Sequence, residues 1–260
     1  MHEEWTTWLA AIMDDPAARL RCTDLLTDLF LDLTELAAPA LFVEAGAHEA
    51  TASTRVKRRL PECRVIAFEA NPYVHQYMSG LHDFRRAGVE YRHEALADGP
   101  PEVTFRVVTD AEGLDDPRYH GFSSLNSRHH DQEQGVVYAN RTVPATTLDD
   151  VGAAVPGRTS LWVDVEGAAR QVLLGGPEFL SRCDVVLIEV EDVPFWRDQW
   201  LVADVVTELQ RHGLVPLARD VEYDQQYNMV LASNRLLELP ACHTRTAAFK
   251  SDLSALSRPA

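Results

Sequence analysis

Two acidic residues in the first third of the chain stand at the ends of short apolar runs, where a ligand could be recognised. The run 41–43 ends at Glu44 and is followed by Gly46, and the run 64–68 ends at Glu69. Such runs are typical of buried parallel strands, and a glycine between them lets backbone and ligand approach closely. A carboxylate at the second strand end can accept hydrogen bonds from both hydroxyls of a ribose. The pattern therefore predicts half of a nucleotide-binding unit around Gly46 and Glu69.

The number of glycines in the first loop indicates which cofactor is favoured. A dinucleotide pyrophosphate needs three glycines at set spacing, whereas the loop EAGAHEA, residues 44–50, contains one. The two acids of this loop, Glu44 and Glu49, would also lie near the phosphates of a bound dinucleotide. These features favour S-adenosylmethionine, which has a ribose for Glu69 and positively charged sulfonium and amino groups that tolerate acidic surroundings. The alternative interpretation is a buried strand and turn that binds no ligand.

A second pair of acids, Asp164 and Glu166, follows the apolar run 160–163. Moving a methyl group onto a hydroxyl requires the proton to leave as the new bond forms, so a nearby carboxylate can act as general base. Asp164 is the first candidate for this base and Glu166 the second. The alternative, which is compatible with the first, is that they cap the helix expected from Gly167.

Two further acids, Glu189 and Glu191, end another apolar run and point to one face of the predicted strand. Together with Asp164 they could hold a divalent cation through oxygen ligands. Clustered acids at a strand edge are more often solvated or paired with arginine, so the sequence predicts no metal site.

The polar segment 109–135 interrupts the regular pattern. An irregular stretch of this length is either disordered or functional. Its histidines His120, His129 and His130 could offer a base from a lid over the substrate. Their irregular spacing and polar setting favour solvated histidines over a base, and the sequence leaves open whether the segment is a lid or disordered.

The apolar runs alternate with helical segments, which is typical of an α/β protein. The predicted core strands are 41–43, 64–68, 89–92, 160–164 and 184–189, followed by 214–217 and 227–232. An additional strand is predicted at 103–108. No helix fits between the last two strands, so the final strand is expected to be antiparallel.

The two ends of the chain are expected to lie outside this pattern. Residues 2–37 predict two amphipathic helices that separate near Asp15 and Pro16. We therefore expect a helical cap over 1–38, a single domain over 39–236 and a loose polar tail over 237–260. The cap could also serve as a homodimer surface or as a lid.

Composition restricts the class of partner. The chain has 260 residues, 46% of them hydrophobic, and a net charge of -16, which disfavours nucleic acid and anionic membrane surfaces. The four cysteines show no paired spacing, so neither zinc nor a disulfide framework is indicated. There is no signal-peptide pattern and no long apolar run, which predicts a cytoplasmic protein.

The sequence resembles the FkbM-type methyltransferases, a family of S-adenosylmethionine-dependent O-methyltransferases. Four segments carry the resemblance: FVEAGAHEATAS from Phe42, VIAFEANP from Val65, ALAD with EVTF within 95–105, and TLDD with WVDVEGAARQVL within 147–173. The resemblance covers residues 40–235, and DVEG is its most specific part. Ala50 stands where the family usually has a second glycine, and Ala169 stands where it has a second acid.

The resemblance implies a Rossmann-like class I methyltransferase fold, with a seven-stranded, mostly parallel sheet and an antiparallel last strand. It also implies methyl transfer to a hydroxyl of a small molecule, such as a secondary metabolite or a sugar. Gly46 would lie against the methionine part, Glu44 or His48 at its amino group, and Glu94 with Ala95 at the adenine. The complete set of expected cofactor-binding residues is Glu44, Gly46, Ala47, His48, Glu69, Ala70, Glu94, Ala95 and Asp164.

Two alternative functions stay open. A nicotinamide-dependent oxidoreductase is disfavoured by the missing glycines and by the closing strand pair. A non-catalytic binding module with the same fold is left open by Ala50 and Ala169.

Overall fold

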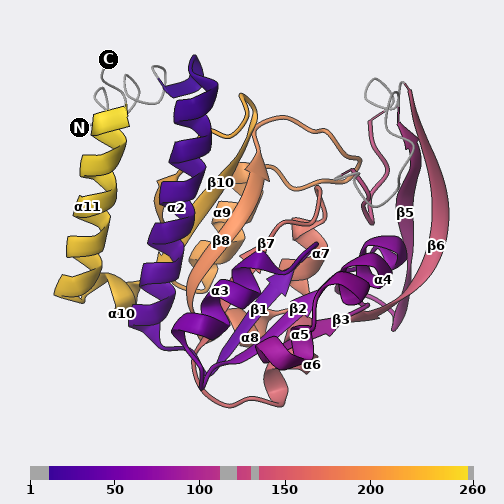
Figure 1. Ribbon diagram of the computed structural model, residues 1–260, viewed down its shortest axis with the longest axis horizontal. Helices are drawn as coiled ribbons and strands as arrows, with labels where there is room; N and C mark the ends of the chain where they lie inside the picture. The colour runs from indigo at the N-terminus through magenta and orange to yellow at the C-terminus, as the bar shows by residue number, and fades with distance from the viewer. Residues whose placement is uncertain (1–11, 112–121, 130–134, 257–260) are drawn as a thin grey trace.

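The computed structural model describes residues 12–111, 122–129 and 135–256 (Figure 1). Its centre is a seven-stranded sheet of order β3-β2-β1-β7-β8-β10-β9. The strands are β1 Leu41–Ala45, β2 Arg64–Phe68, β3 Val89–Arg92, β7 Thr159–Val163, β8 Cys183–Glu191, β9 Leu214–Arg219 and β10 Gln226–Ser233. All pairings are parallel except those of β10, which is antiparallel to β8 and β9. The expected class I methyltransferase fold is thereby confirmed.

Helices cover both faces of this sheet. They are α2 Pro16–Ala37, α3 Thr51–Arg59, α4 Pro72–Leu81, α5 Phe84–Ala87, α6 Leu148–Ala153, α7 Ala169–Leu174, α8 Pro177–Ser181, α9 Val202–Arg211, α10 Asn234–Leu237 and α11 Pro240–Leu256. Phe42 belongs to the same buried cluster as side chains of α2, α3 and α11, whereas its neighbours Leu41 and Val43 belong to the cluster that contains side chains of α7, α8 and α9. This alternation explains why β1 is buried along its whole length. None of the described helices has the length and apolar character to cross a membrane.

The start of α2 follows the sequence prediction. The Asp15 carboxylate accepts hydrogen bonds from the N–H groups of Ala17 at 2.9 Å and Ala18 at 3.3 Å, and Pro16 occupies the first helical position. The helix expected before it lies largely in residues 1–11, outside the described residues. The predicted use of these N-terminal helices as a dimer surface stays a prediction.

The expectation of a loose C-terminal tail is wrong for most of its length. Residues 240–256 form α11, which lies beside α2 (Figure 1), and Arg245 forms an ion pair with Asp32 of α2 at 2.9 Å. The buried face of α11 comprises Cys242, Thr246, Phe249 and Leu253. Their spacing of three and four residues is helical, but the polar residues between them conceal the narrow apolar stripe.

A second sheet stands at one side of the molecule (Figure 1). It consists of β4 Ala95–Leu96, β5 Glu102–Ala111 and β6 Val136–Thr146, in the order β4-β6-β5. The additional predicted strand is β5, and its antiparallel partner β6 was not expected at its full length. Part of the polar segment is attached to this sheet, because the backbones of Arg106 and Ser124 exchange hydrogen bonds of 2.8 and 3.0 Å. That part is therefore not a solvated loop.

A charge cluster joins β8 to the end of β10. The buried carboxylate of Asp184 accepts hydrogen bonds from Arg158 at 2.6 Å, Ser233 at 2.6 Å and Arg235. Burial alone would raise the pKa of Asp184, but these hydrogen bonds lower it to about 2. These hydrogen bonds fix the start of β8, which is the fifth parallel strand along the chain.

We expect Asp184→Asn to reduce the free energy of unfolding by about 2 kcal/mol, since the hydrogen bonds to a charged group are weakened. The pKa of Asp184 is lower in the folded chain than its ordinary 3.8, so its stabilisation is complete above that value and is lost as the pH falls towards 2. Urea unfolding of both proteins at about pH 6 and about pH 3 measures this, and the difference should shrink at the lower pH. An equal difference at both values would contradict the prediction.

Candidate active site

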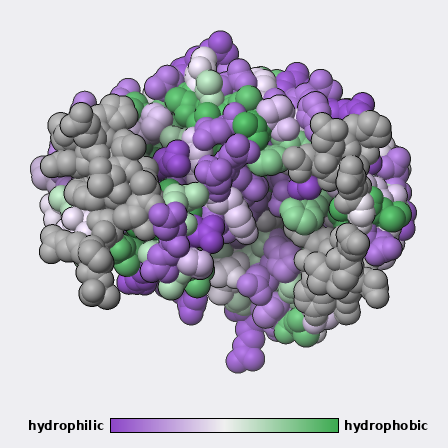
Figure 2. Space-filling model, turned by 90° about the horizontal axis from the view of Figure 1, so that it is seen from above, coloured by the Kyte–Doolittle hydropathy of each residue, from purple (hydrophilic) through white to green (hydrophobic). Residues whose placement is uncertain are grey.

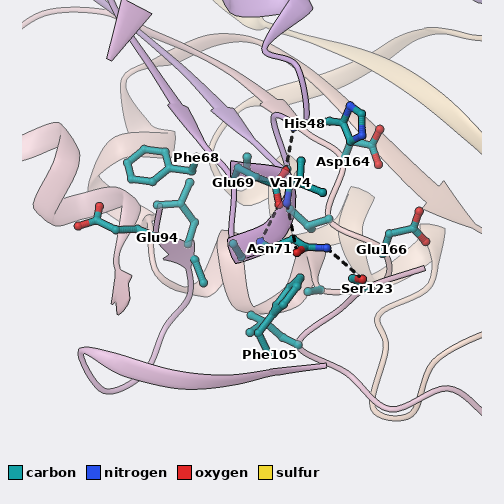
Figure 3. Close-up of a pocket in the computed structure, with 18 residues that line it drawn as sticks. His48, Phe68, Glu69, Asn71, Val74, Glu94, Phe105, Ser123, Asp164 and Glu166 are labelled. Atoms are coloured by element: carbon teal, nitrogen blue, oxygen red, sulfur yellow. Dashed lines mark hydrogen bonds between the residues drawn. The ribbon is translucent and has the colours of Figure 1, made fainter. Parts of the chain in front are cut away.

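The carboxyl ends of β1, β2 and β7 enclose a cavity of about 280 Å³ (Figure 3). Its lining includes most of the residues expected from the sequence: Gly46, His48, Glu69, Ala70, Glu94, Ala95, Asp164 and Glu166. It also includes residues that were not expected at the cofactor: Phe68, Asn71, Val74, Leu96, Phe105, Ser123 and Leu125. The predicted neighbourhood of Gly46 and Glu69 is thus formed around a real hollow, as open α/β sheets form at strand ends.

Gly46 is the residue on which the three strand ends converge. It adopts a φ of +78°, and a Cβ added there would overlap the carbonyl oxygen of Asp164. The N–H groups of Gly46 and Ala47 both donate to the carbonyl oxygen of Phe68, at 3.0 and 2.9 Å. Only glycine fits this conformation and this space.

Ala50, which stands where the family usually has a second glycine, adopts a backbone conformation that favours glycine. Ala50 lies in the left-handed region with φ 53° and ψ 42°, and it is fully buried. His48 of the same loop has φ 44°. Left-handed backbone in residues other than glycine stores strain that the surrounding structure must offset, and such strain is common at functional loops.

Glu69 is held rigidly while keeping capacity for a ligand. One carboxylate oxygen accepts a hydrogen bond from the N–H of His48 at 2.9 Å, and the other accepts one from Asn71 N–H at 2.7 Å. A carboxylate has about four lone-pair sites, so roughly two remain for the hydroxyls of a ribose. Burial raises the pKa of Glu69, and the two N–H groups oppose that shift.

We expect Glu69→Ala to weaken binding of S-adenosylmethionine by at least ~10-fold, because two charge-assisted hydrogen bonds to the ribose are lost. Titration calorimetry measures the affinity. Glu90→Ala is the matched control, since Glu90 lies on the neighbouring β3 and pairs with Arg64 rather than lining the cavity. Unchanged affinity in Glu69→Ala would reject the ribose assignment.

Two residues expected at the cofactor do not line the cavity. The Glu44 carboxylate instead accepts a hydrogen bond of 2.8 Å from the N–H of Ser53 in the first turn of α3, and burial raises its pKa to about 7. Ala47 is buried and is not part of the cavity lining. The glycine turn folds the start of α3 back over the end of β1, so Glu44 supports the helix N-terminus rather than a ligand.

The two ends of the cavity differ in chemistry. Glu94 lies near Phe68 on one side of Glu69, whereas Asp164 and Glu166 lie on the other side (Figure 3). Phe105 adds a further apolar surface to the lining. This distribution suits an adenine at the first end and a reacting group beside the acids at the second.

Asp164 and Glu166 have the properties of partly buried acids. Burial raises the pKa of Asp164 to about 6, while a hydrogen bond with the Glu189 side chain and, less strongly, the neighbouring His48 oppose the shift. Burial, followed by the charge of Asp164, raises the pKa of Glu166 well above its ordinary value. No side-chain hydrogen bond caps α7 within the described chain, so the alternative of two capping acids is wrong. A carboxylate with a pKa near 6 is mostly ionised at neutral pH and is a stronger base than ordinary aspartate.

The turn that carries Glu166 is clamped by the segment 122–127. Ser124 Oγ donates to the carbonyl oxygen of Glu166 at 2.6 Å, and Asn126 Nδ2 donates to that of Gly167 at 2.7 Å. Gln171 Nε2 in turn donates to Asn126 Oδ1 at 2.6 Å. On its other side the turn lies against Trp196, whose indole a Cβ at Gly167 would overlap. These contacts hold Glu166 at its φ of 50°.

We expect Asn126→Ala to lower the free energy of unfolding by about 1–3 kcal/mol, because Gly167 and Gln171 lose their partner. Turnover should fall more than cofactor affinity, since Asn126 supports the turn of Glu166 and does not line the cavity. Chemical unfolding and steady-state kinetics measure the two effects. Asn140→Ala on the exposed edge of β6 is the control, and equal behaviour of the two variants would contradict the clamp.

Of the three histidines of the polar segment, His129 alone is among the described residues, and it does not line the cavity. His129 is exposed, and its N–H donates to the carbonyl oxygen of Phe195 at 3.0 Å. His120 and His130 lie outside the described residues. A lid in this segment stays a prediction.

Comparison with known proteins identifies the family. The family model for the methyltransferase FkbM domain matches residues 44–215. A comparison with curated protein sequences finds no match.

Solved structures with similar folds include several methyltransferases. Precorrin-6y C5,15-methyltransferase from Geobacter metallireducens GS-15 is 14% identical, with a TM-score of 0.43, over 80% of this chain and 87% of that chain. Methyltransferase FkbM from Methylobacillus flagellatus KT is 10% identical, with a TM-score of 0.46, over 75% of this chain and 44% of that one. Magnesium protoporphyrin IX methyltransferase from Synechocystis PCC 6803, with bound S-adenosylmethionine, is 7% identical, with a TM-score of 0.45, over 85% of this chain and 84% of that one.

These identities and TM-scores are too low to support a shared activity, so the assignment depends on the family match. That match spans more than half of the chain, and the protein therefore belongs to the FkbM methyltransferase family.

Proposed function

We propose that this protein is an S-adenosylmethionine-dependent O-methyltransferase that acts on a hydroxyl of a small molecule, such as a secondary metabolite or a sugar. The observation that carries the proposal is Glu69, whose two oxygens are fixed by N–H groups on a cavity wall yet keep lone pairs for a ribose. The adenine would lie towards Glu94 and Ala95. The methionine part would lie against Gly46, so the sulfonium would face Asp164 and Glu166.

The acids beside the expected sulfonium support transfer to oxygen. In the reaction, the bond between sulfur and the methyl carbon breaks, and a bond forms between that carbon and the acceptor oxygen. The hydroxyl proton passes to the Asp164 carboxylate, and S-adenosylhomocysteine and the methyl ether are the products. The carboxylates of Asp164 and Glu166 also disfavour anionic acceptors, because like charges repel one another at short range.

The cofactor is tested by thermal unfolding with S-adenosylmethionine and with NADH added separately. A ligand that binds only the folded chain raises the melting temperature, so the first should raise it and the second should not. The reverse result would support an oxidoreductase. Formation of S-adenosylhomocysteine in the presence of candidate alcohols then tests transfer, and failure with every acceptor class despite cofactor binding would support a binding module instead.

A further inference from the structure

The loop between β1 and α3 supplies a hydrogen-bond donor to Glu69, although its outer side faces solvent. The N–H of His48 donates to one carboxylate oxygen of Glu69 at 2.9 Å. The side chains of His48 and Glu49 are exposed, and mainly hydrophilic residues border the hollow in the face seen in Figure 2. Packing from the solvent side therefore contributes little to the conformation of His48, and other contacts must hold it.

His48 also has a backbone conformation that is costly for a residue with a side chain. Its φ is 44°, and the same loop contains Gly46 at 78° and Ala50 at 53°. Residues other than glycine persist in this region only where the surrounding structure offsets the strain. If His48 relaxed, its N–H would turn away and Glu69 would lose one of its two backbone donors.

Tyr91 supplies the contact on the other side of His48. It lies in β3, an edge strand of the seven-stranded sheet, and its hydroxyl donates to the carbonyl oxygen of His48 at 2.5 Å. The two peptide groups that flank the Cα of His48 are therefore both held, one by Tyr91 and the other by Glu69. Because a residue has only two soft backbone dihedrals, φ and ψ, holding both peptide groups fixes its conformation.

The ring of Tyr91 is fixed independently of its hydroxyl. It stacks on His75 of α4, with ring centres 4.8 Å apart and an interplanar angle of 13°, and its centre lies 4.2 Å from that of Phe84 in α5. Burial, followed by the charges of Glu69 and Glu44, raises the pKa of Tyr91, so the hydroxyl keeps its proton and remains a donor. The strand and the two helices thus direct a permanent donor at the loop.

A second side chain at the end of this strand contacts the backbone next to Glu69. His93 follows β3, and its Nε2 lies 3.2 Å from the carbonyl oxygen of Ala70. The ring of His75 lies against that of His93 as well, with centres 5.2 Å apart. The edge strand therefore contacts both segments that adjoin the Glu69 carboxylate, one at His48 and the other at Ala70.

We propose that Tyr91 is a positioning residue for the cofactor, which holds His48 in the left-handed conformation that lets the His48 N–H orient the Glu69 carboxylate towards the ribose. Tyr91 is not among the described residues that line the cavity, so it acts through His48 and Glu69 rather than on the cofactor itself. Such preorganisation lowers the cost of ordering the site when the ligand binds. The role at the ribose rests on the proposed function, whereas the restraint on His48 does not.

The test is Tyr91→Phe, which keeps the stacked ring and removes only the hydroxyl. Affinity for S-adenosylmethionine, measured by titration calorimetry on the full chain, should fall ~5-fold, the factor that corresponds to one hydrogen bond of ordinary strength. Tyr227→Phe is the matched control, because its hydroxyl donates to Asp192 at 3.0 Å and Tyr227 does not line the cavity. This control should bind the cofactor as the wild type does.

The route of the effect is tested in the Glu69→Ala background. Tyr91→Phe should change the affinity of Glu69→Ala by less than ~2-fold, since the carboxylate that Tyr91 helps to orient is absent. Circular dichroism and the melting temperature verify that each variant folds. A further ~5-fold loss in that background, or an unchanged affinity of Tyr91→Phe alone, would overturn the positioning role.

Hydrogen exchange tests the restraint on His48 without any cofactor. The exchange rate of the His48 amide, measured by nuclear magnetic resonance, should rise ~5-fold in Tyr91→Phe, because exchange follows the population of the open loop. Amides of α9 should exchange as in the wild type. An unchanged rate at His48 would overturn the restraint.

The two proposals fail separately. Faster exchange at His48 in Tyr91→Phe, together with a wild type that binds no S-adenosylmethionine, would retract the proposed function and the role at the ribose but keep the restraint. Cofactor binding by the wild type that Tyr91→Phe leaves unchanged would retract the positioning role alone.

Discussion

Gly46→Ala is expected to abolish measurable binding of S-adenosylmethionine and to destabilise the chain. The added Cβ would overlap the carbonyl oxygen of Asp164, and alanine disfavours the φ of +78°. Relief of the overlap would separate the ends of β1 and β7, which both line the cavity where we propose that the cofactor binds. Backbone strain and steric overlap in a buried turn together lower the free energy of unfolding by several kcal/mol. Displacement of the strand ends that line the cavity should lower the cofactor affinity by more than ~100-fold.

Gly80→Ala is the matched control for this variant. Gly80 lies within α4, and no atom lies within 4 Å of the position that a Cβ would take. Alanine is favoured over glycine in helices by about 0.5–1 kcal/mol, so this change should stabilise the chain and leave cofactor affinity unchanged. Titration calorimetry and urea unfolding measure both variants. Cofactor binding by Gly46→Ala at wild-type affinity would show that the cavity is not the cofactor site.

Asp164→Asn is expected to lower the turnover number by at least ~100-fold, the low end of what general bases contribute. The amide has nearly the same shape but cannot accept the hydroxyl proton. S-adenosylmethionine affinity should change little, because the substitution preserves the volume of the side chain. It also preserves the backbone hydrogen bond of this position, in which the N–H donates to the carbonyl oxygen of Ala45 at 3.0 Å. Single-turnover formation of S-adenosylhomocysteine, with binding measured separately by calorimetry, distinguishes the two steps.

Asp98→Asn serves as the control, because Asp98 is exposed and does not line the cavity. Retained turnover in Asp164→Asn would remove this residue as the base and leave Glu166 as the next candidate. Loss of both turnover and cofactor affinity would instead assign Asp164 to cofactor binding.

Much of the central sheet could be predicted because its evidence is local. The runs at β1, β2, β7 and β8 are continuous and apolar, since both faces of each strand are buried. Gly46 and Glu69 could be placed because strand, turn and strand follow one another within a short segment. For the same reason the antiparallel direction of β10 followed from the short connection after β9.

The failures share a different physical cause, since they depend on contacts between distant parts of the chain. Glu44 has the position of a ligand-binding acid, but the fold of α3 over the strand end directs it to Ser53. Nothing near Asn126 in the sequence indicates that it binds the carbonyl of Gly167, 41 residues away. The role of α11 likewise depends on α2, more than 200 residues earlier. Periodicity within a window cannot report such pairings.

Ser124 connects the β5–β6 hairpin to the turn that follows β7. Its backbone is paired with Arg106 of the β5–β6 hairpin, and its hydroxyl is bonded to the carbonyl of Glu166. A shift of the hairpin would therefore displace the turn that carries Glu166, the second candidate for the general base. In a chimera made by exchanging hairpins between relatives, residues 122–127 should therefore come from the same parent as the hairpin. Otherwise the hydrogen bond between Ser124 and the Glu166 turn is at risk.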